Sequence, residues 1–349
     1  MLIDSFQAFD EIELALFRIR FLSEYVDRVI IGESNLTHSG LRKPLYFREY
    51  FSNHRTELSR RVEIITLDLS GFSNSWSREI KSRELVIKHI FEHYPQAYFI
   101  NSDLDEIPSL ESLSLLQNST EKFFHFSAKT YYRYANWALL DSHKEWNRGV
   151  LGHTNGPEPE NGGRFTKFPI IPSKSKGAHF SYVGRSHDSF SLKLESFAHT
   201  ELNRTKLKSR EFLDFADYYA VDHLGRSRES GFGLLRVIPE AQFDQIQSEL
   251  FRQYPDFFRF PSQLPNSFSR FIASVAITSI VNTGFQQRAI YSFFIEIDKA
   301  FIVRVGCILG ITFEVLVSTI FLFRREVLKW IRKFQKSYPK LPGRGTRKL

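Results

Sequence analysis

Two aspartates one residue apart follow an apolar, aromatic run and carry the clearest chemical signal in the chain. The run covers residues 98–100, and Asp103 and Asp105 come soon after it, ahead of Glu106 and Pro108. In a strand, side chains at i and i+2 point to the same side, so a strand end here would project both carboxylates together. Paired carboxylates suit Mg²⁺ or Mn²⁺, ions that take further ligands from substrate phosphates. The pattern therefore predicts a metal–diphosphate site.

Two other interpretations of the aspartate pair stay open at this point. In a solvated turn, the aspartates would only cap the residues that follow them. A phosphatase with an aspartyl nucleophile also has Asp-x-Asp after a strand, but Thr or Val usually comes next, with a lysine motif downstream. Residues 106–108 are Glu-Ile-Pro and do not fit that pattern.

The elements that would position this pair alternate along the first hundred residues. Strand patterns lie at residues 2–3, 29–33, 62–69 and 98–102, and helical patterns lie at residues 10–25 and 76–93. Such alternation predicts an α/β protein with a mostly parallel sheet between layers of helices. Ligands of these sheets bind beyond the carboxyl ends of the strands, where Glu33 and Asp103 would both fall.

Weaker patterns follow in the rest of the chain. We expect strands within residues 122–134, 164–171 and 177–183, a surface loop over residues 149–163, and helices near residues 189–197, 208–219 and 240–252. Prolines cluster close to residue 260 and indicate a boundary there. We therefore predict a catalytic domain over residues 1–260 and a different segment over residues 261–349.

The C-terminal segment is apolar and then strongly basic. Residues 271–285 and 305–323 are apolar helical candidates, although Glu314 interrupts the second, and residues 324–349 hold ten basic residues against one acid. Because this tail accounts for the net charge of +8, the body is nearly neutral and does not indicate a nucleic-acid binder. The pattern predicts association of residues 268–349 with a membrane surface. A buried helical subdomain is the alternative.

The charge pattern also predicts an orientation at the membrane. A basic flank stays on the cytoplasmic side, and the first residues do not have the pattern of an export signal. A hairpin of two segments, or helices lying in the interface, would keep both ends on that side. We therefore expect a membrane-associated protein whose catalytic domain faces the cytoplasm.

Several short motifs besides the aspartate pair occur in a characteristic order. They are residues 4–6 with 11–14, residues 26–40, residues 43–47, the set Trp76, Glu79 and Arg83, residues 102–108, residues 177–182 and residues 193–201. In these motifs the chain resembles glycosyltransferase family 17, a group that includes N-acetylglucosaminyltransferases. The resemblance covers about residues 2–260, and Ala178 stands where the family pattern usually has Trp.

The resemblance implies a GT-A-type fold, with a mixed sheet flanked by helices, and an inverting transfer from a nucleotide sugar. The donor would be UDP-GlcNAc, the acceptor a glycan, and the cofactor Mn²⁺ or Mg²⁺ held by Asp103 and Asp105. If the role of the animal enzymes applied, the protein would lie in the Golgi membrane.

The resemblance also points to residues that would act beside the metal. Inverting transfer needs a base for the acceptor hydroxyl, and Glu201 and Asp188 are the candidates. Glu201 is preferred because it lies in the matching His-x-Glu motif, although a surface or capping carboxylate is an equal alternative. His199, or His179 instead, could complete the metal shell, and a buried core histidine is the alternative for each.

Further polar residues could contact the nucleotide. Glu33 and Asn35 follow an early strand. Arg83 and Arg226 could each bind a phosphate through two parallel hydrogen bonds from the guanidinium group. For Arg83, an ion pair with Glu79 one helical turn earlier is the structural alternative.

Two rival functions remain compatible with the sequence. A nucleotidyltransferase could use the same carboxylate pair on a sugar phosphate and would release pyrophosphate. A non-catalytic, membrane-tethered carbohydrate-binding protein is the other.

Overall fold

The computed structural model describes residues 1–119, 121–139, 145–224 and 233–265, together with positions 270, 273, 274, 277 and 281. Residues 1–274 form one compact unit and residues 275–349 a second. Arg226 and nearly all of residues 268–349 lie outside the described residues, so the predicted boundary near residue 260 and the predicted membrane segment stay predictions.

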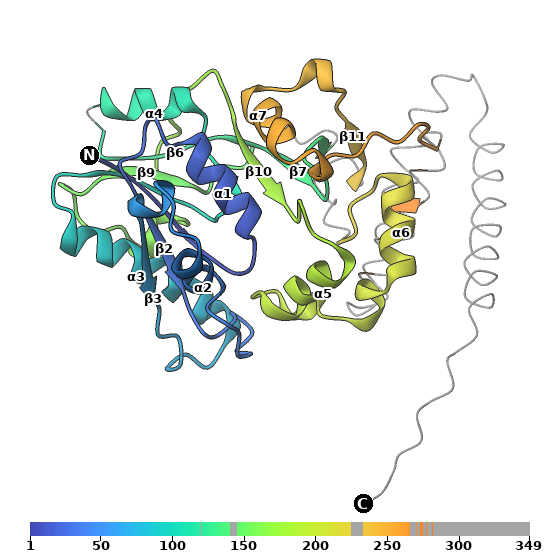
Figure 1. Cartoon of the computed structure of the whole chain (residues 1–349), viewed down its shortest axis with the longest axis horizontal. Coiled ribbons are helices and arrows are strands. Elements are labelled where there is room, and N and C mark those ends of the chain that lie inside the picture. Colours follow the sequence, from blue (N-terminus) through green and yellow to red (C-terminus); the bar gives the residue numbers. More distant parts are fainter. Residues whose placement is uncertain are drawn as a thin grey trace, which may run out of the picture. The chain divides into compact units, whose positions relative to one another are not determined.

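The described residues form seven α-helices and eleven strands (Figure 1). The helices are α1 (Ile12–Phe21), α2 (Tyr46–Asn53), α3 (Ser75–His93), α4 (Leu110–Gln117), α5 (His187–Ser196), α6 (Arg210–Tyr219) and α7 (Gln245–Gln253). Within the described part of the chain, none of them is both long and apolar enough to cross a membrane.

A six-stranded mixed sheet is ordered β3-β2-β1-β4-β9-β6. Its strands are β1 (Leu2–Gln7), β2 (Arg28–Glu33), β3 (Val62–Thr66), β4 (Tyr98–Asn101), β6 (Phe123–His125) and β9 (Val150–His153). The first four strands in this order run parallel to one another, and β9 runs antiparallel to β4 and β6. The α/β class and the mixed sheet are therefore confirmed.

Each face of this sheet has its own apolar core, because successive side chains of a strand point to opposite faces. Ile3 and Ile30 pack with buried side chains of α3, whereas Leu2 and Val29, one residue earlier on each strand, belong to the cluster that contains α1. Helices therefore flank the sheet, as the alternating pattern predicted, and α3 lies against β1 and β2 (Figure 1).

A second sheet, which the sequence did not indicate as a separate one, has the order β11-β8-β7-β10-β5. Its strands are β5 (Glu106–Ile107), β7 (Ala128–Tyr132), β8 (Trp137–Leu139), β10 (Gly177–Ser181) and β11 (Leu235–Val237). Strand β5 follows directly after the aspartate pair, and its Glu106 is paired with His179 of β10. The aspartates therefore lie where the chain passes from one sheet to the other.

Two expectations about the middle of the chain were wrong. The Gly-rich residues 149–163 contain β9, an interior strand of the first sheet. A Cβ on Gly152 would lie 2.6 Å from ring atoms of both Phe99 and Phe123, so this glycine makes room for aromatic packing and does not form a turn. The predicted strand at 164–171 is also absent from the described structure, where Ile170 forms only an isolated bridge with His125.

The predicted helices lie close to their expected places. Helices α1, α3, α5 and α6 fall within the expected ranges or within two residues of them. Helix α7 starts at Gln245, later than the expected residue 240, because Asp244 and Gln247 form a capping box there. The preceding residues Glu240–Gln242 form a short 3₁₀ helix instead.

Candidate functional site

Asp103 and Asp105 lie in the turn between β4 and β5. Strand β4 ends at Asn101, so neither aspartate is part of a strand. The i, i+2 rule therefore does not apply to them, and their side chains contact different partners. The turn nevertheless lies beyond the carboxyl end of β4, at the edge of the sheet where α/β proteins bind ligands.

Two arginines hold the carboxylate of Asp103. Arg83 of α3 donates from Nε and Nη2 to Oδ1 at 3.1 and 2.8 Å, and Arg164 Nη2 lies 2.9 Å from Oδ2. Burial opposes the charge on Asp103, but the two guanidinium groups outweigh it and hold the pKa of this carboxyl well below its ordinary value. Asp103 is therefore an anion fixed in orientation, with 30% of its side chain exposed.

Arg83 forms the ion pair with Glu79 that was the structural alternative, and its contact with a phosphate stays a prediction. Its Nη1 is 2.9 Å from Glu79 Oε1, so the ion pair along α3 forms. The remaining nitrogens face the carboxylate of Asp103, which places this guanidinium inside the cluster.

Asp105 faces a second group of charges. Lys193 Nζ of α5 lies 3.6 Å from its Oδ2, and His179 Nε2 lies 3.9 Å from its Oδ1. Lys193 also donates to Glu11 at 3.0 Å, and Arg185 pairs with the same Glu11 carboxylate. Burial would lower the pKa of Lys193, but Glu11 and Asp105 raise it, so the ammonium ion stays charged.

Glu106 is fully buried directly behind the two aspartates. Its carboxylate accepts a hydrogen bond from Trp146 Nε1 at 2.6 Å, and Arg164 Nη1 lies 3.0 Å away. Burial raises the pKa of Glu106 to about 7, with Arg164 opposing the shift and the charges of Asp103 and Asp105 adding to it. Arg164 is thus shared between the partly exposed carboxylate of Asp103 and the buried carboxylate of Glu106.

A buried ion pair between α1 and β1 contacts the backbone of the turn. Asp4 of β1 and Arg18 of α1 are both fully buried, with Arg18 Nη2 2.6 Å from Asp4 Oδ1. The Arg18 Nη1 group donates to the backbone carbonyls of Asp103, Leu104 and Glu106 at 2.7, 3.2 and 3.1 Å. One guanidinium therefore fixes the backbone that presents both aspartates.

Glu33, a candidate for nucleotide contact, caps a helix. Its Oε1 accepts from the backbone N–H of Phe47 at 2.9 Å and its Oε2 from that of Arg48 at 3.0 Å, at the start of α2. A carboxylate at a helix N-terminus is stabilised by these unpaired N–H groups. The side chain of Asn35 is exposed, two residues farther on.

His199 and Glu201 form an exposed pair beside Trp76, at the amino-terminal end of α3. His199 Nδ1 is 2.7 Å from Glu201 Oε1, and both side chains are nearly half exposed. The His199 ring also meets Trp76 edge to face, with centroids 4.6 Å apart. The contacts of His199 are therefore with Trp76, Phe197 and Glu201, and no contact joins it to either aspartate in the described part of the chain.

The two remaining candidates are not brought into this cluster by any described contact. Asp188 is exposed in the first turn of α5, where a carboxylate favours the helix dipole. Arg226 lies outside the described residues.

Only some of the carboxylate oxygens of Asp103 and Asp105 are available to bind a Mg²⁺ or Mn²⁺ ion. Both oxygens of Asp103 already accept from guanidinium groups, whereas the contacts of Asp105 are longer. Within the described stretches, no three His, Cys, Asp or Glu side chains gather in a way that could hold a metal. An ion here would therefore rely on Asp105, a shared Asp103, and oxygens from substrate phosphates and water.

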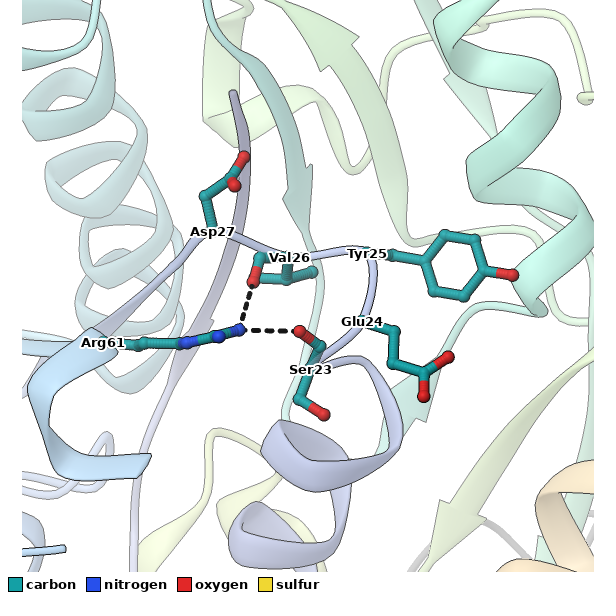
Figure 2. Close-up of a pocket in the computed structure, with 6 residues that line it drawn as sticks. All are labelled: Ser23, Glu24, Tyr25, Val26, Asp27 and Arg61. Carbon is teal, nitrogen blue, oxygen red and sulfur yellow. Dashed lines mark hydrogen bonds between the residues drawn. The ribbon is translucent and has the colours of Figure 1, made fainter. Parts of the chain in front are cut away.

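A surface hollow in another part of the molecule is not a second candidate for the functional site. It is lined by Ser23, Glu24, Tyr25, Val26, Asp27 and Arg61 (Figure 2). Arg61 closes one side by donating to the backbone carbonyl of Ser23 at 2.7 Å. The hollow precedes β2 and so lies at the amino ends of the parallel strands, opposite to the edge where ligands of such sheets bind.

Sequence reasoning missed Arg18, Arg164 and the role of Lys193. Lys193 stands within one of the motifs that carried the family resemblance, so the signal was present but not assigned. Arg164 and Arg18 are distant in sequence from the residues they contact, and only the folded chain brings them to the turn.

Comparison with known proteins gives a consistent result. Residues 2–250 match the family model described as glycosyltransferase family 17. The chain is also similar to the human and rat proteins named β-1,4-mannosyl-glycoprotein 4-β-N-acetylglucosaminyltransferase, each 32% identical over 133 residues. These matches cover 34% of this chain and 25% of each relative, so the chain spans about a quarter of their length.

Proposed function

The chain belongs to glycosyltransferase family 17, and from this premise we propose that it is an inverting, UDP-GlcNAc-dependent N-acetylglucosaminyltransferase of the GT-A type. The observation that carries the proposal is the charged cluster around Asp103 and Asp105 at the carboxyl edge of the parallel strands. The acceptor is a sugar hydroxyl, and the names of the human and rat relatives suggest a mannosyl residue.

The aspartate turn would form the donor end of the site. Asp105 and Asp103 would hold Mn²⁺ or Mg²⁺, and the ion would supply Lewis-acid neutralisation of the charge on the leaving UDP. Arg83 and Arg164 orient Asp103 through three contacts of 2.8–3.1 Å, so little reorganisation is needed when the donor binds. Lys193 adds a positive charge beside Asp105 for the diphosphate.

Glu201 is our choice for the base. An acceptor oxygen forms a bond to the anomeric carbon on the face opposite UDP, the bond from that carbon to the diphosphate oxygen breaks, and the hydroxyl proton moves to the carboxylate. Glu201 is exposed and hydrogen-bonded to an imidazole, whereas Asp188 lies in the first turn of a helix. We assign His199, which contacts Glu201, to supporting this base and not to binding the metal ion.

The decisive experiment incubates the purified protein with Mn²⁺ and a panel of UDP-sugars, with and without mannoside acceptors, and measures released UDP. We expect turnover of UDP-GlcNAc above that of the other donors. Pyrophosphate as the product would indicate a nucleotidyltransferase instead. Unchanged UDP release after replacing both aspartates, in D103A/D105A, would contradict the proposal and favour a non-catalytic carbohydrate-binding protein.

We also propose that residues 268–349 attach the protein to an anionic membrane surface, with the catalytic domain on the cytoplasmic side. Support comes from the apolar segments and the ten basic residues that follow them. Flotation with vesicles containing phosphatidylserine tests this, and binding that is lost in a chain ending at residue 267 is the expected result. Equal flotation of both chains would contradict it.

A further inference from the structure

One indole contacts side chains that surround both aspartates. Trp146 Nε1 donates to Glu106 Oε1 at 2.6 Å, and the indole ring stacks on the imidazole of His179 with centroids 4.4 Å apart. The guanidinium carbon of Arg164 lies 5.7 Å from the centroid of the same indole ring. Trp146 therefore meets a carboxylate, an imidazole and a guanidinium group of the charged cluster.

These three neighbours connect the indole to both aspartates. On one side, Glu106 Oε2 accepts from the backbone N–H of Asp103 at 3.2 Å, and Arg164 Nη2 lies 2.9 Å from Asp103 Oδ2. On the other side, His179 Nε2 lies 3.9 Å from Asp105 Oδ1. Glu106 is fully buried, so its carboxylate depends on its few polar partners. One indole thus joins partners of Asp103 to a partner of Asp105.

The backbone of Trp146 is fixed to the second sheet. Its N–H donates to the carbonyl of Ala128 and its carbonyl accepts from the N–H of Ala128, both at 2.9 Å. Ala128 is the first residue of β7, which pairs with the strand that carries His179. The charge-assisted hydrogen bond to Glu106 then fixes the orientation of the ring. A side chain held in this way can orient its neighbours, because its own conformation is locked.

From these contacts we infer that Trp146 is a positioning residue of the transfer reaction, whose indole keeps the carboxylates of Asp103 and Asp105 in one arrangement for the metal ion and the diphosphate. The inference rests on the proposed function. Without the indole, Glu106 loses a hydrogen-bond donor and His179 loses a stacking partner. The aspartates would then sample other orientations, and ordering them again would weaken the binding of the ion.

The test measures the Mn²⁺ affinity of the full chain by calorimetric titration at a fixed concentration of UDP. W146F keeps an aromatic ring beside His179 but loses the N–H, so we expect the Kd for Mn²⁺ to rise about fivefold. W146A loses both the ring and the N–H, and the Kd should rise about thirtyfold. A tryptophan that only stabilised the fold would leave the affinity of the folded protein unchanged. Kd values of both variants within about twofold of the wild type would overturn the inference.

The matched control is W137F, which also removes one indole hydrogen bond. Trp137 of β8 is fully buried, and its Nε1–H donates to the backbone carbonyl of Arg259 at 3.0 Å. We expect W137F to bind Mn²⁺ within about twofold of the wild-type affinity. An equal loss in W137F and W146F would mean a general effect of packing and would overturn the inference. Thermal melting verifies that each variant is folded, and W146F decides the question if W146A does not fold.

A double-mutant cycle tests the contact through Glu106. W146F and Glu106→Leu remove the two sides of one hydrogen bond, so the double variant W146F/E106L should bind Mn²⁺ about as weakly as E106L alone. Losses that add in the double variant would overturn the connection from the indole through Glu106 to Asp103.

Release of UDP separates failure of this inference from failure of the proposed function. Mn²⁺ binding that depends on Trp146, without UDP release from any donor, would overturn the proposed function and support the positioning role. UDP release from UDP-GlcNAc with unchanged Mn²⁺ affinity in both Trp146 variants would overturn the positioning role and leave the function standing.

Discussion

Helix α3 carries Trp76 in its first turn and Arg83 near its middle, and the surroundings of these two residues, called here the Trp76 end and the Arg83 end, differ in almost every physical property. At the Arg83 end, Asp103 is held by two guanidinium groups, Glu106 is fully buried, and the Asp4–Arg18 pair lies under the turn. At the Trp76 end, the indole, His199 and Glu201 are between two fifths and half exposed. The first end is rigid before any ligand arrives, and the second is accessible. The contrast suits a small, highly charged donor at one end and a variable, neutral acceptor at the other.

The strongest test of this contrast is the substitution Arg18→Met. It leaves the Asp4 carboxylate and three backbone carbonyls without their buried partner, so we expect a loss of about 3–5 kcal/mol in the free energy of unfolding. Urea denaturation measures it. The double variant D4N/R18M should recover part of the loss, because it removes the unpaired charge. A cost below about 1 kcal/mol for R18M would contradict the supporting role of the pair.

The next test concerns the charge beside Asp105. Lys193→Met removes the ammonium ion that lies 3.6 Å from this carboxylate, so we expect the donor KM to rise about tenfold while the acceptor KM changes little. Steady-state kinetics with UDP-GlcNAc measures both constants. Lys193→Arg should retain most of the donor affinity. An unchanged donor KM in K193M would remove Lys193 from the donor end.

We expect a smaller effect on the free energy of unfolding when a change of pH protonates His38. Burial lowers the pKa of His38 to about 4, with Arg83 and Arg78 adding to the shift and Glu79 and Asp103 opposing it. The unfolded chain binds the proton near pH 6.5, so stability is lost as the pH falls from about 6.5 to about 4. Since this side chain is partly exposed, we expect about 1–2 kcal/mol. Denaturation across this range should show a flatter profile for H38Q, and parallel profiles would contradict the assignment.

The smallest effect should come from the Trp76 end. His199→Asn removes an exposed imidazole–carboxylate contact, and such pairs contribute less than about 1 kcal/mol to stability. Thermal melting should therefore change by no more than a few degrees. A loss comparable to that of R18M would mean that the Trp76 end is part of the rigid core.

Much of the fold could be predicted from the sequence, and the reason lies in local patterns. The period of apolar residues located α1 and α3, and the short apolar runs located β1, β2 and β4. The failures occurred where distant residues decide the structure. Gly152 resembles a loop residue in sequence, yet it is a strand residue because Phe99 and Phe123 cover it.

The sequence indicated the acidic side chains of the site but not most of the basic side chains that hold them. Asp103 and Asp105 stood out because they follow an apolar run, and Arg83 because it shares a helix with Glu79. Arg164 and Arg18 come from other parts of the chain, and no local pattern pairs them with the turn. Glu33 was a reasonable nucleotide candidate by its place at the carboxyl end of β2, but that same place lets it cap α2.

The central claim is that the donor binds at the aspartate turn and not at the Trp76 end. Calorimetric titration of UDP in the presence of Mn²⁺ tests it most directly, with the wild type, Asp105→Asn and Trp76→Ala measured side by side. The account predicts that D105N weakens UDP binding at least tenfold and that W76A stays within twofold of the wild type. Wild-type affinity in D105N, or an equal loss in W76A, would contradict it.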